Sequence, residues 1–316
     1  MPPRIIFNLV IFILLAGCAP HYSSPYHQPQ AVIGQINAIV DALPREYQLD
    51  VELALHRAKK NAGELVKALS YFDGERREAM AFLVRYMPAR DLETLSSEFL
   101  INNVRLAYQS RDEVPWGKDI PKDVFLNYVL PYVNVNERRD NWRGDFTARF
   151  LPLAKEQGSI NKAAVYLNTK AFEVLGVEYH ATKRHKPDQS PYESITLGYA
   201  SCTGLSILAA DVLRSAGIPV RIAGIPIWAD KSGNHTWIEV WDHGQWYHLG
   251  AAEAGGYNEA WFNEKAAHTD PSHPAHRIYA VSFRRTAVLY PAVWNLQVDD
   301  IYAEDVTARY LELPSK

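Results

Sequence analysis

The residues GYASCTGLSILAADVLRSAGIPVRIAG, numbered 198–224, decide the fold of this chain. Apolar side chains recur three and four residues apart from Leu205 to Val212, which predicts an amphipathic helix that ends near Gly217. The next residues, 220–224 (VRIAG), have the composition of a buried strand. This segment therefore predicts a helix that turns back into a sheet.

Cys202 stands at the predicted N-terminus of this helix. The unpaired backbone N–H groups and the positive end of the helix dipole favour a thiolate there, and a thiolate is the form of cysteine that attacks carbonyl groups. The apolar run near the N-terminus, residues 5–15, predicts that the protein is exported. A free thiol outside the cytoplasm is exposed to oxidation, so its presence indicates a chemical role.

A strand and a hairpin are predicted next. Residues 235–241 (HTWIEVW) alternate so that His235, Trp237 and Glu239 share one face. The turn 242–244 (DHG) then leads into QWYHLG. Because these elements would fold beside the preceding helix, the sequence predicts that His235 comes close to Cys202.

The stretches SCTGLSILAADVLRSAGIPVRIAG and NHTWIEVWDHGQWYHLGAAE resemble the transglutaminase-like superfamily, over about residues 192–262. The resemblance implies an α+β fold in which a helix packs on an antiparallel, papain-like sheet. It implies Cys202 as nucleophile and His235 as base. The implied activity is cleavage or transfer of peptide or protein amide bonds through an acyl-enzyme, as in a cysteine peptidase, an amidase or a protein-glutamine acyltransferase.

The third catalytic residue departs from the family's pattern. In the common form an Asp follows the Trp of the second hairpin strand by four residues, whereas here Trp246 leads to Gly250. Glu253 is the nearest replacement, and Asp242 or no acid at all are the alternatives. With a two-residue turn, Asp242 would pair with Gln245 and His235 would face Ala252, so Glu253 would point away from the face of His235. A three-residue turn or a bulge would reverse this.

Other candidate site residues are weaker. Tyr199 and Trp228 are candidate substrate-binding aromatics of the cleft, whereas Trp237 and Trp261 are predicted to be core residues. Five histidines lie in the hairpin and in the loop that follows it, but they lack the tight spacing of metal ligands. They are predicted to be scattered surface residues, and no metal site is predicted: His243, His248, His268, His273 and His276. The implied thiol chemistry needs no cofactor.

The N-terminus has the features of an export signal. Arg4 precedes an apolar run, 5–15, that is too short to span a bilayer. The run ends in LAGC, which resembles the lipobox of bacterial lipoproteins. This resemblance implies removal of residues 1–17, acylation of Cys18 and a membrane anchor, and Ala19 in place of Asp implies the outer membrane, facing the periplasm.

The rest of the chain has four predicted parts. Residues 18–30 form a polar tether, 31–178 a helical region, 179–290 the transglutaminase-like domain and 291–316 a β-rich tail. Within the helical region, Arg138, Arg139, Trp142 and Arg143 are predicted to lie on a solvated helical surface, and a substrate groove is the alternative.

Composition limits the partners. The net charge of −3 and the lack of a basic stripe argue against nucleic acid. The function expected is therefore that of a lipid-anchored, exported cysteine enzyme. The alternatives are an inactive binding or scaffold lipoprotein of the cell envelope, and a carbohydrate binder that uses its aromatic residues.

Overall fold

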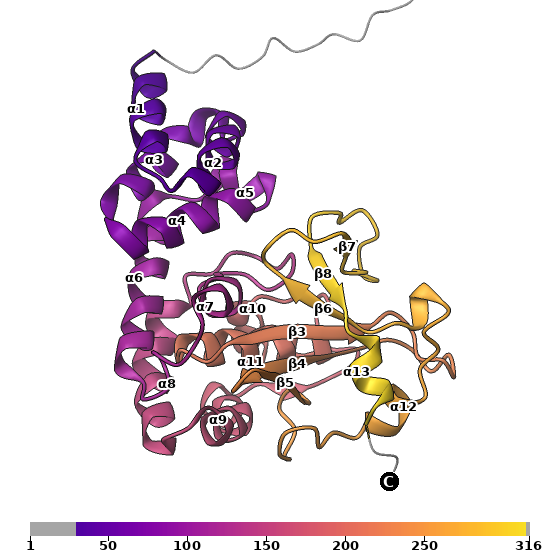
Figure 1. The fold of residues 1–316 in the computed structure, drawn as a ribbon. Helices are drawn as coiled ribbons and strands as arrows, with labels where there is room; N and C mark the ends of the chain where they lie inside the picture. The colour runs from indigo at the N-terminus through magenta and orange to yellow at the C-terminus, as the bar shows by residue number, and fades with distance from the viewer. Residues whose placement is uncertain (1–29, 314–316) are drawn as a thin grey trace, which may run out of the picture.

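The computed structural model describes residues 30–313. A helical region is followed by a domain that is built around an antiparallel sheet, which confirms the predicted α+β class (Figure 1). The predicted signal peptide, Cys18 and nearly all of the tether lie outside the described residues. Within residues 30–313, no helix is both long and apolar enough to cross a membrane.

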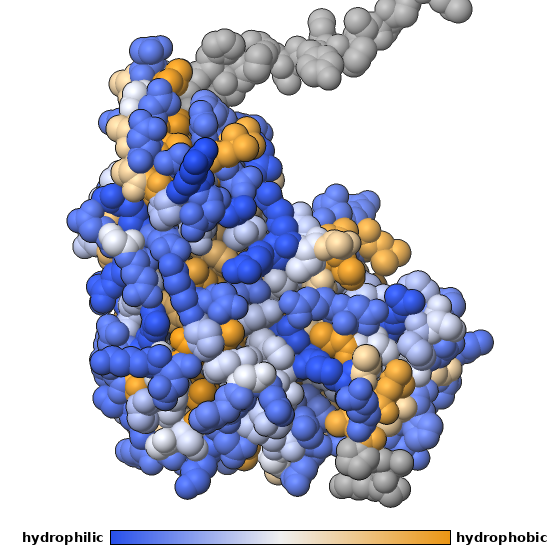
Figure 2. Space-filling view, viewed as in Figure 1, coloured by the Kyte–Doolittle hydropathy of each residue, from blue (hydrophilic) through white to orange (hydrophobic). Residues whose placement is uncertain are grey.

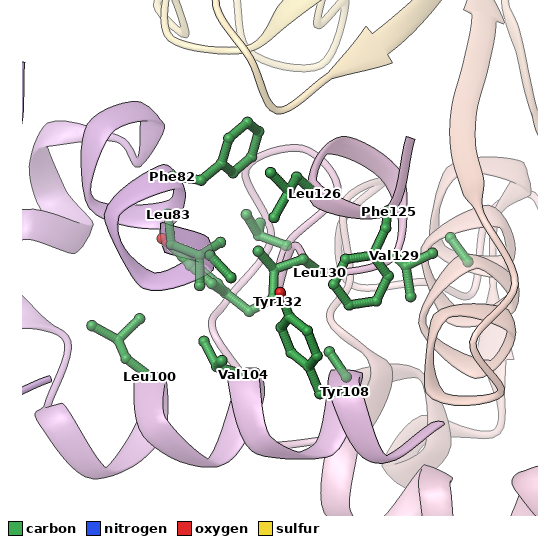
Figure 3. Packing of buried hydrophobic residues seen from close by; sticks show 14 of the residues in the cluster. Phe82, Leu83, Leu100, Val104, Tyr108, Phe125, Leu126, Val129, Leu130 and Tyr132 are labelled. Carbon is green, nitrogen blue, oxygen red and sulfur yellow. The ribbon is translucent and has the colours of Figure 1, made fainter. Parts of the chain in front are cut away.

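Nine helices and a short 3-10 turn make up the helical region of the described chain. They are α1 (Gln30–Asp41), α2 (Arg45–Arg57), η1 (Lys59–Asn61), α3 (Ala62–Tyr71), α4 (Gly74–Tyr86), α5 (Ala89–Thr94), α6 (Ser97–Glu113), α7 (Lys122–Tyr128), α8 (Arg143–Gln157) and α9 (Ile160–Leu175). Figure 3 shows their packing, with Phe82 of α4, Val104 of α6 and Phe125 of α7 converging on Tyr132. Burial of large apolar side chains, each worth about 1.5–3 kcal/mol, therefore holds these helices together.

The remaining elements form the second part. They are β1 (Glu178–Tyr179), α10 (Pro191–Leu197), β2 (Tyr199–Ala200), α11 (Cys202–Ser215), β3 (Val220–Ile225), β4 (His235–Asp242), β5 (Gln245–Leu249), α12 (Asn263–Ala267), η2 (Pro274–His276), β6 (Tyr279–Ser282), β7 (Val288–Leu289), β8 (Tyr302–Asp305) and α13 (Thr307–Leu311).

Six of these strands form one antiparallel sheet, in the order β5-β4-β3-β6-β8-β7. Helix α11 packs on β3 and β4, so the predicted helix, strand and hairpin are adjacent in space (Figure 1). The hairpin closes with Asp242 opposite Gln245, and both residues between them have positive φ, +46° at His243 and +88° at Gly244. This is the two-residue turn that matches the twist of paired strands.

A buried ionic cluster fixes β4 to the C-terminal helix. Glu239 of β4 accepts hydrogen bonds from Arg221 of β3 (2.7 Å), from Arg309 (2.7 and 2.9 Å) and from the Tyr310 hydroxyl (2.8 Å). Burial alone would raise the pKa of Glu239, but the two guanidinium groups lower it. The carboxylate therefore remains charged and ties α13 to the strand that begins with His235.

Two sequence predictions differ from the structure. In the tail that was predicted to be β-rich, residues 307–311 form the short helix α13, and only β8 is a strand. Tyr310 is buried, and its hydroxyl also accepts a hydrogen bond from the Trp237 indole (2.6 Å). Tertiary contacts of this residue therefore override the local alternation.

The solvated surface predicted for Arg138, Arg139, Trp142 and Arg143 forms only in part, because Arg138 is exposed whereas Trp142 and Arg143 are buried. Arg143 is 2% exposed, and its guanidinium donates to the carbonyls of residues 129–131 and to Arg214 of α11 (3.2 Å). Ser110 of α6 likewise donates to the carbonyl of Ser215 (2.6 Å). Side chains of the helical region thus satisfy carbonyls of an irregular segment and of the C-terminal turn of α11, as buried backbone requires.

Candidate active site

Cys202 is the first residue of α11 and is half-buried. The preceding residue, Ser201, has extended backbone angles, and its side chain does not cap the helix. The backbone N–H groups of the first turn are therefore free to stabilise negative charge on the sulfur or on a reacting oxygen.

His235 is the first residue of β4. One side-chain contact places the start of β4 beside the start of α11. The hydroxyls of Thr203 and Thr236, the residues that directly follow Cys202 and His235, lie 3.1 Å apart. Cys202 and His235 both line one cleft of about 1410 Å³. This volume exceeds that of a typical drug-sized pocket.

Aromatic side chains surround the imidazole of His235. Ring centroids lie 4.9 Å away for Trp261, 5.0 Å for Phe262, 5.7 Å for Trp237 and 6.2 Å for Trp228. Burial in these surroundings lowers the pKa of His235 to about 4. The imidazole is therefore uncharged at neutral pH, and its Nε2 is buried without a hydrogen-bond partner within residues 30–313.

The third candidate, Glu253, lies on a turn that follows β5. The β4–β5 ladder ends at Ile238 opposite Leu249, so the extrapolated pairing of His235 with Ala252 does not form. The chain instead turns, with Ala252 at φ +65° and a hydrogen bond of 3.1 Å from Glu253 N to the Gly250 carbonyl.

This turn returns the Glu253 carboxyl group to Gly250. A Cβ atom placed on Gly250 would lie only 2.1 Å from Glu253 Oε2, and its three nearest atoms would all belong to that carboxyl group. Burial raises the pKa of Glu253, and its Oε1 accepts a hydrogen bond from Trp261 Nε1 (3.0 Å). The indole of Trp261 thus contacts the imidazole by its ring and the carboxylate by its N–H.

Asp242, the alternative acid, is excluded by position. It ends β4, whereas His235 begins it. Seven residues of extended strand separate the two by roughly 24 Å. The Asp242 carboxylate instead contacts the neighbouring His243 (2.5 Å).

The predicted aromatic residues fall in different places. Trp228 lines the cleft but is only 2% exposed, with its ring stacked on Trp237 at 6.1 Å. Tyr199 is not among the cleft-lining residues and contacts His180 instead. The prediction for Trp261 was wrong, because this residue is 59% exposed at the cleft and only its position in space reveals its role.

Of the five histidines from His243 to His276, His248 is not the surface residue that was predicted. It lies on β5 and is buried, and its Nε2 lies 2.7 Å from Asn263 Oδ1. Within residues 30–313, no group of three or more His, Cys, Asp or Glu side chains is placed to hold a metal ion.

Replacing Trp261 with Ala is expected to raise the pKa of His235 from about 4 toward its ordinary value of 6.5, because the indole covers the imidazole. An NMR titration of the imidazole, assigned by comparison with His235→Gln, measures this. Tyr179→Ala is the matched control, since Tyr179 is an exposed aromatic residue of the same cleft that makes no ring contact with His235. An unchanged pKa in Trp261→Ala would show that other residues keep the imidazole neutral.

Comparison with known proteins gives one family match. Residues 153–251 match the model of the Transglutaminase-like superfamily. This part of the chain is therefore similar to transglutaminase-like domains. The matched residues include both Cys202 and His235 and end just before Glu253.

A solved structure from Cytophaga hutchinsonii, described as that of a proposed cysteine protease, is also similar. It matches at 18% identity and a TM-score of 0.27, over 35% of this chain and 40% of its own length. A similarity of this extent adds no argument about activity. Among curated proteins, none matches this chain.

Proposed function

We propose that this protein is a cysteine hydrolase that acts on peptide or protein amides. The observation that carries the proposal is the contact between Thr203 and Thr236, which brings the thiol at the start of α11 and the imidazole at the start of β4 to one cleft. Acyl transfer by a thiol requires at least a nucleophile and a base. Cys202 at the start of α11 and His235 at the start of β4 supply these two groups.

The neutral imidazole gives the reaction its first step. His235 accepts the proton of Cys202 as the sulfur attacks the amide carbonyl, so a thiolate and an imidazolium form together. The backbone N–H groups at the start of α11 donate to the oxygen that becomes negative. His235 then gives its proton to the leaving amine, and an acyl-enzyme remains on the sulfur.

Water completes the cycle. His235 accepts a proton from a water molecule that attacks the thioester, and the acid product leaves with the thiol restored. An amine in place of water would give transamidation. Water is always available at a broad, open cleft, which favours hydrolysis.

Glu253 is proposed as the acid of the site. Its carboxylate stabilises the imidazolium that forms when His235 takes a proton. Support comes from its return to Gly250, which is the position where the common form of the family has its acid, and from its link to His235 through Trp261.

We further propose that the protein is tethered to the cell envelope through Cys18. Cys18 follows an apolar run and small residues, and acylation at this position would tether the domain to the cell envelope. Envelope peptides and proteins would then be the accessible amides. Incorporation of labelled palmitate into the wild-type chain but not into Cys18→Ser tests this part alone.

The decisive experiment for catalysis is capture of an acyl adduct on Cys202. The protein is incubated with a library of peptide amides, quenched in acid and digested, and the peptide that contains Cys202 is read by mass spectrometry. We expect an acyl mass increase on Cys202 in the wild type and none in His235→Ala. Intact protein with an unmodified Cys202 across the library would favour the alternative of an inactive scaffold.

A further inference from the structure

Asn168, on α9, is the buried residue that contacts the turn behind the site. It is 1% exposed, and its Nδ2 donates to the carbonyl of Gly250 (2.8 Å) and to that of Glu253 (3.0 Å). Its Oδ1 is buried without a partner within residues 30–313. Both hydrogen bonds of the Asn168 amide N–H groups therefore go to this turn.

The turn that Asn168 holds determines where the Glu253 carboxyl group lies. Both carbonyls that it binds are the ends of this turn, and the hydrogen bond from Glu253 N to Gly250 O closes it from inside. Without the turn, the chain beyond Leu249 would continue as strand, and alternation would direct Glu253 away from His235.

The Glu253 carboxyl group also lies on the face of the sheet that carries His235. Glu239 lies opposite His248, so the two side chains share a face, and this face also carries Trp237 and His235 two and four residues earlier. Position 250, two residues after His248, belongs to the same face. The space that Glu253 fills at Gly250 is therefore space on the face of the imidazole.

We propose that Asn168 is a positioning residue of the active site. It holds closed the turn that moves the acid from position 250 to Glu253, and so keeps the carboxylate beside the indole that covers His235. This inference rests on the proposed function. It adds that a helix outside the catalytic hairpin fixes the third member of the site.

The test asks whether Asn168 acts through Glu253. The probe is hydrolysis of p-nitrophenyl acetate, followed as release of nitrophenolate. Asn168→Ala is expected to lower kcat by about 10²-fold, with little change in KM, because the carboxylate is displaced from its site. In a Glu253→Gln background the same substitution is expected to change kcat less than about twofold, since the carboxylate is already absent.

A rescue variant makes the test sharper. In Gly250→Asp with Glu253→Ala, the acid returns to position 250, and the three atoms that would clash with its Cβ have been removed. We expect this double variant to recover most of the kcat that Glu253→Ala loses, and to become insensitive to Asn168→Ala.

Asn61→Ala is the matched control. The Nδ2 of Asn61 likewise donates to two carbonyls, those of Leu92 and Leu95 (both 2.9 Å), but Asn61 lies in the helical region and does not line the cleft. Its loss should lower the free energy of unfolding and leave kcat unchanged. If Asn168→Ala is unstable, Asn168→Leu, which keeps the volume, is read in the same way.

Two outcomes would count against the proposal, and they differ. Equal losses of kcat for Asn168→Ala in the wild-type and Glu253→Gln backgrounds, or no loss in either, would overturn the role of Asn168 alone. Absence of any Cys202-dependent turnover in the wild type would overturn the proposed function, and the inference with it.

Discussion

Cys202→Ala is expected to reduce release of nitrophenolate from p-nitrophenyl acetate by about 10⁴- to 10⁶-fold, because the nucleophile is lost and the remaining groups cannot form an acyl-enzyme. The measurement is the initial rate at saturating substrate, with circular dichroism as the check that the fold is unchanged. Cys202 is half-buried at a helix start, so its replacement by Ala should leave the helix intact.

Cys202→Ser serves as the control for shape. It replaces the sulfur with a hydroxyl oxygen and keeps the shape of the side chain, but a hydroxyl lacks the acidity of a thiol, so a large loss is expected here too. A rate for Cys202→Ala within a few-fold of the wild type would mean that another group carries the turnover and that the thiol has no catalytic role.

The largest expected effect on stability comes from Arg221→Met. Arg221 is 1% exposed and Glu239 is 2% exposed, and breaking a buried ion pair from one side typically lowers the free energy of unfolding by about 3–5 kcal/mol. Arg221 also binds Glu304 (2.8 Å) and stacks over Trp246 (3.9 Å), so several contacts are lost together. Urea denaturation followed by tryptophan fluorescence measures the change.

The control for this prediction is an exposed ion pair. Lys59 and Glu93 lie 2.7 Å apart at the surface, with side chains 57% and 39% exposed, and such pairs contribute at most about 1 kcal/mol. Lys59→Ala should therefore leave the denaturation midpoint almost unchanged. Similar midpoints for Arg221→Met and Lys59→Ala would show that the buried cluster does not support the sheet.

Local patterns in the sequence predicted the helix and the hairpin that carry Cys202 and His235. The helix that begins at Cys202, the strand that begins at His235 and the turn at His243 each depend on spacing or on backbone preference within a few residues. These features were predicted correctly because neighbouring residues determine them.

Non-local contacts decided what the sequence did not predict. The direction of Glu253 depends on a turn held by Asn168, which is 85 residues away in the chain. Arginine is usually a surface residue, but Arg143 is buried, because its N–H groups donate hydrogen bonds to carbonyls that lie elsewhere in the chain. An arginine or asparagine near an irregular, proline-containing segment is the signal that could have indicated such a role.

Which apolar side chains are exposed at the surface could not be predicted from residue type either. Figure 2 shows a mostly hydrophilic face on which apolar groups occur in separate patches. Trp261 is exposed although its neighbour Phe262 is fully buried. Hydrophobicity alone could not separate the two, because the orientation of each side chain is set by the loop that leads into α12.

The carbonyls at the end of α11 are bound by Ser110 and Arg143, two residues that precede the matched residues 153–251. The helix that begins with Cys202 is thus anchored at its far end by side chains that the family match does not include. A shortened protein cut to residues 153–251, or a graft of these residues into another scaffold, would have to keep those two supports or replace them.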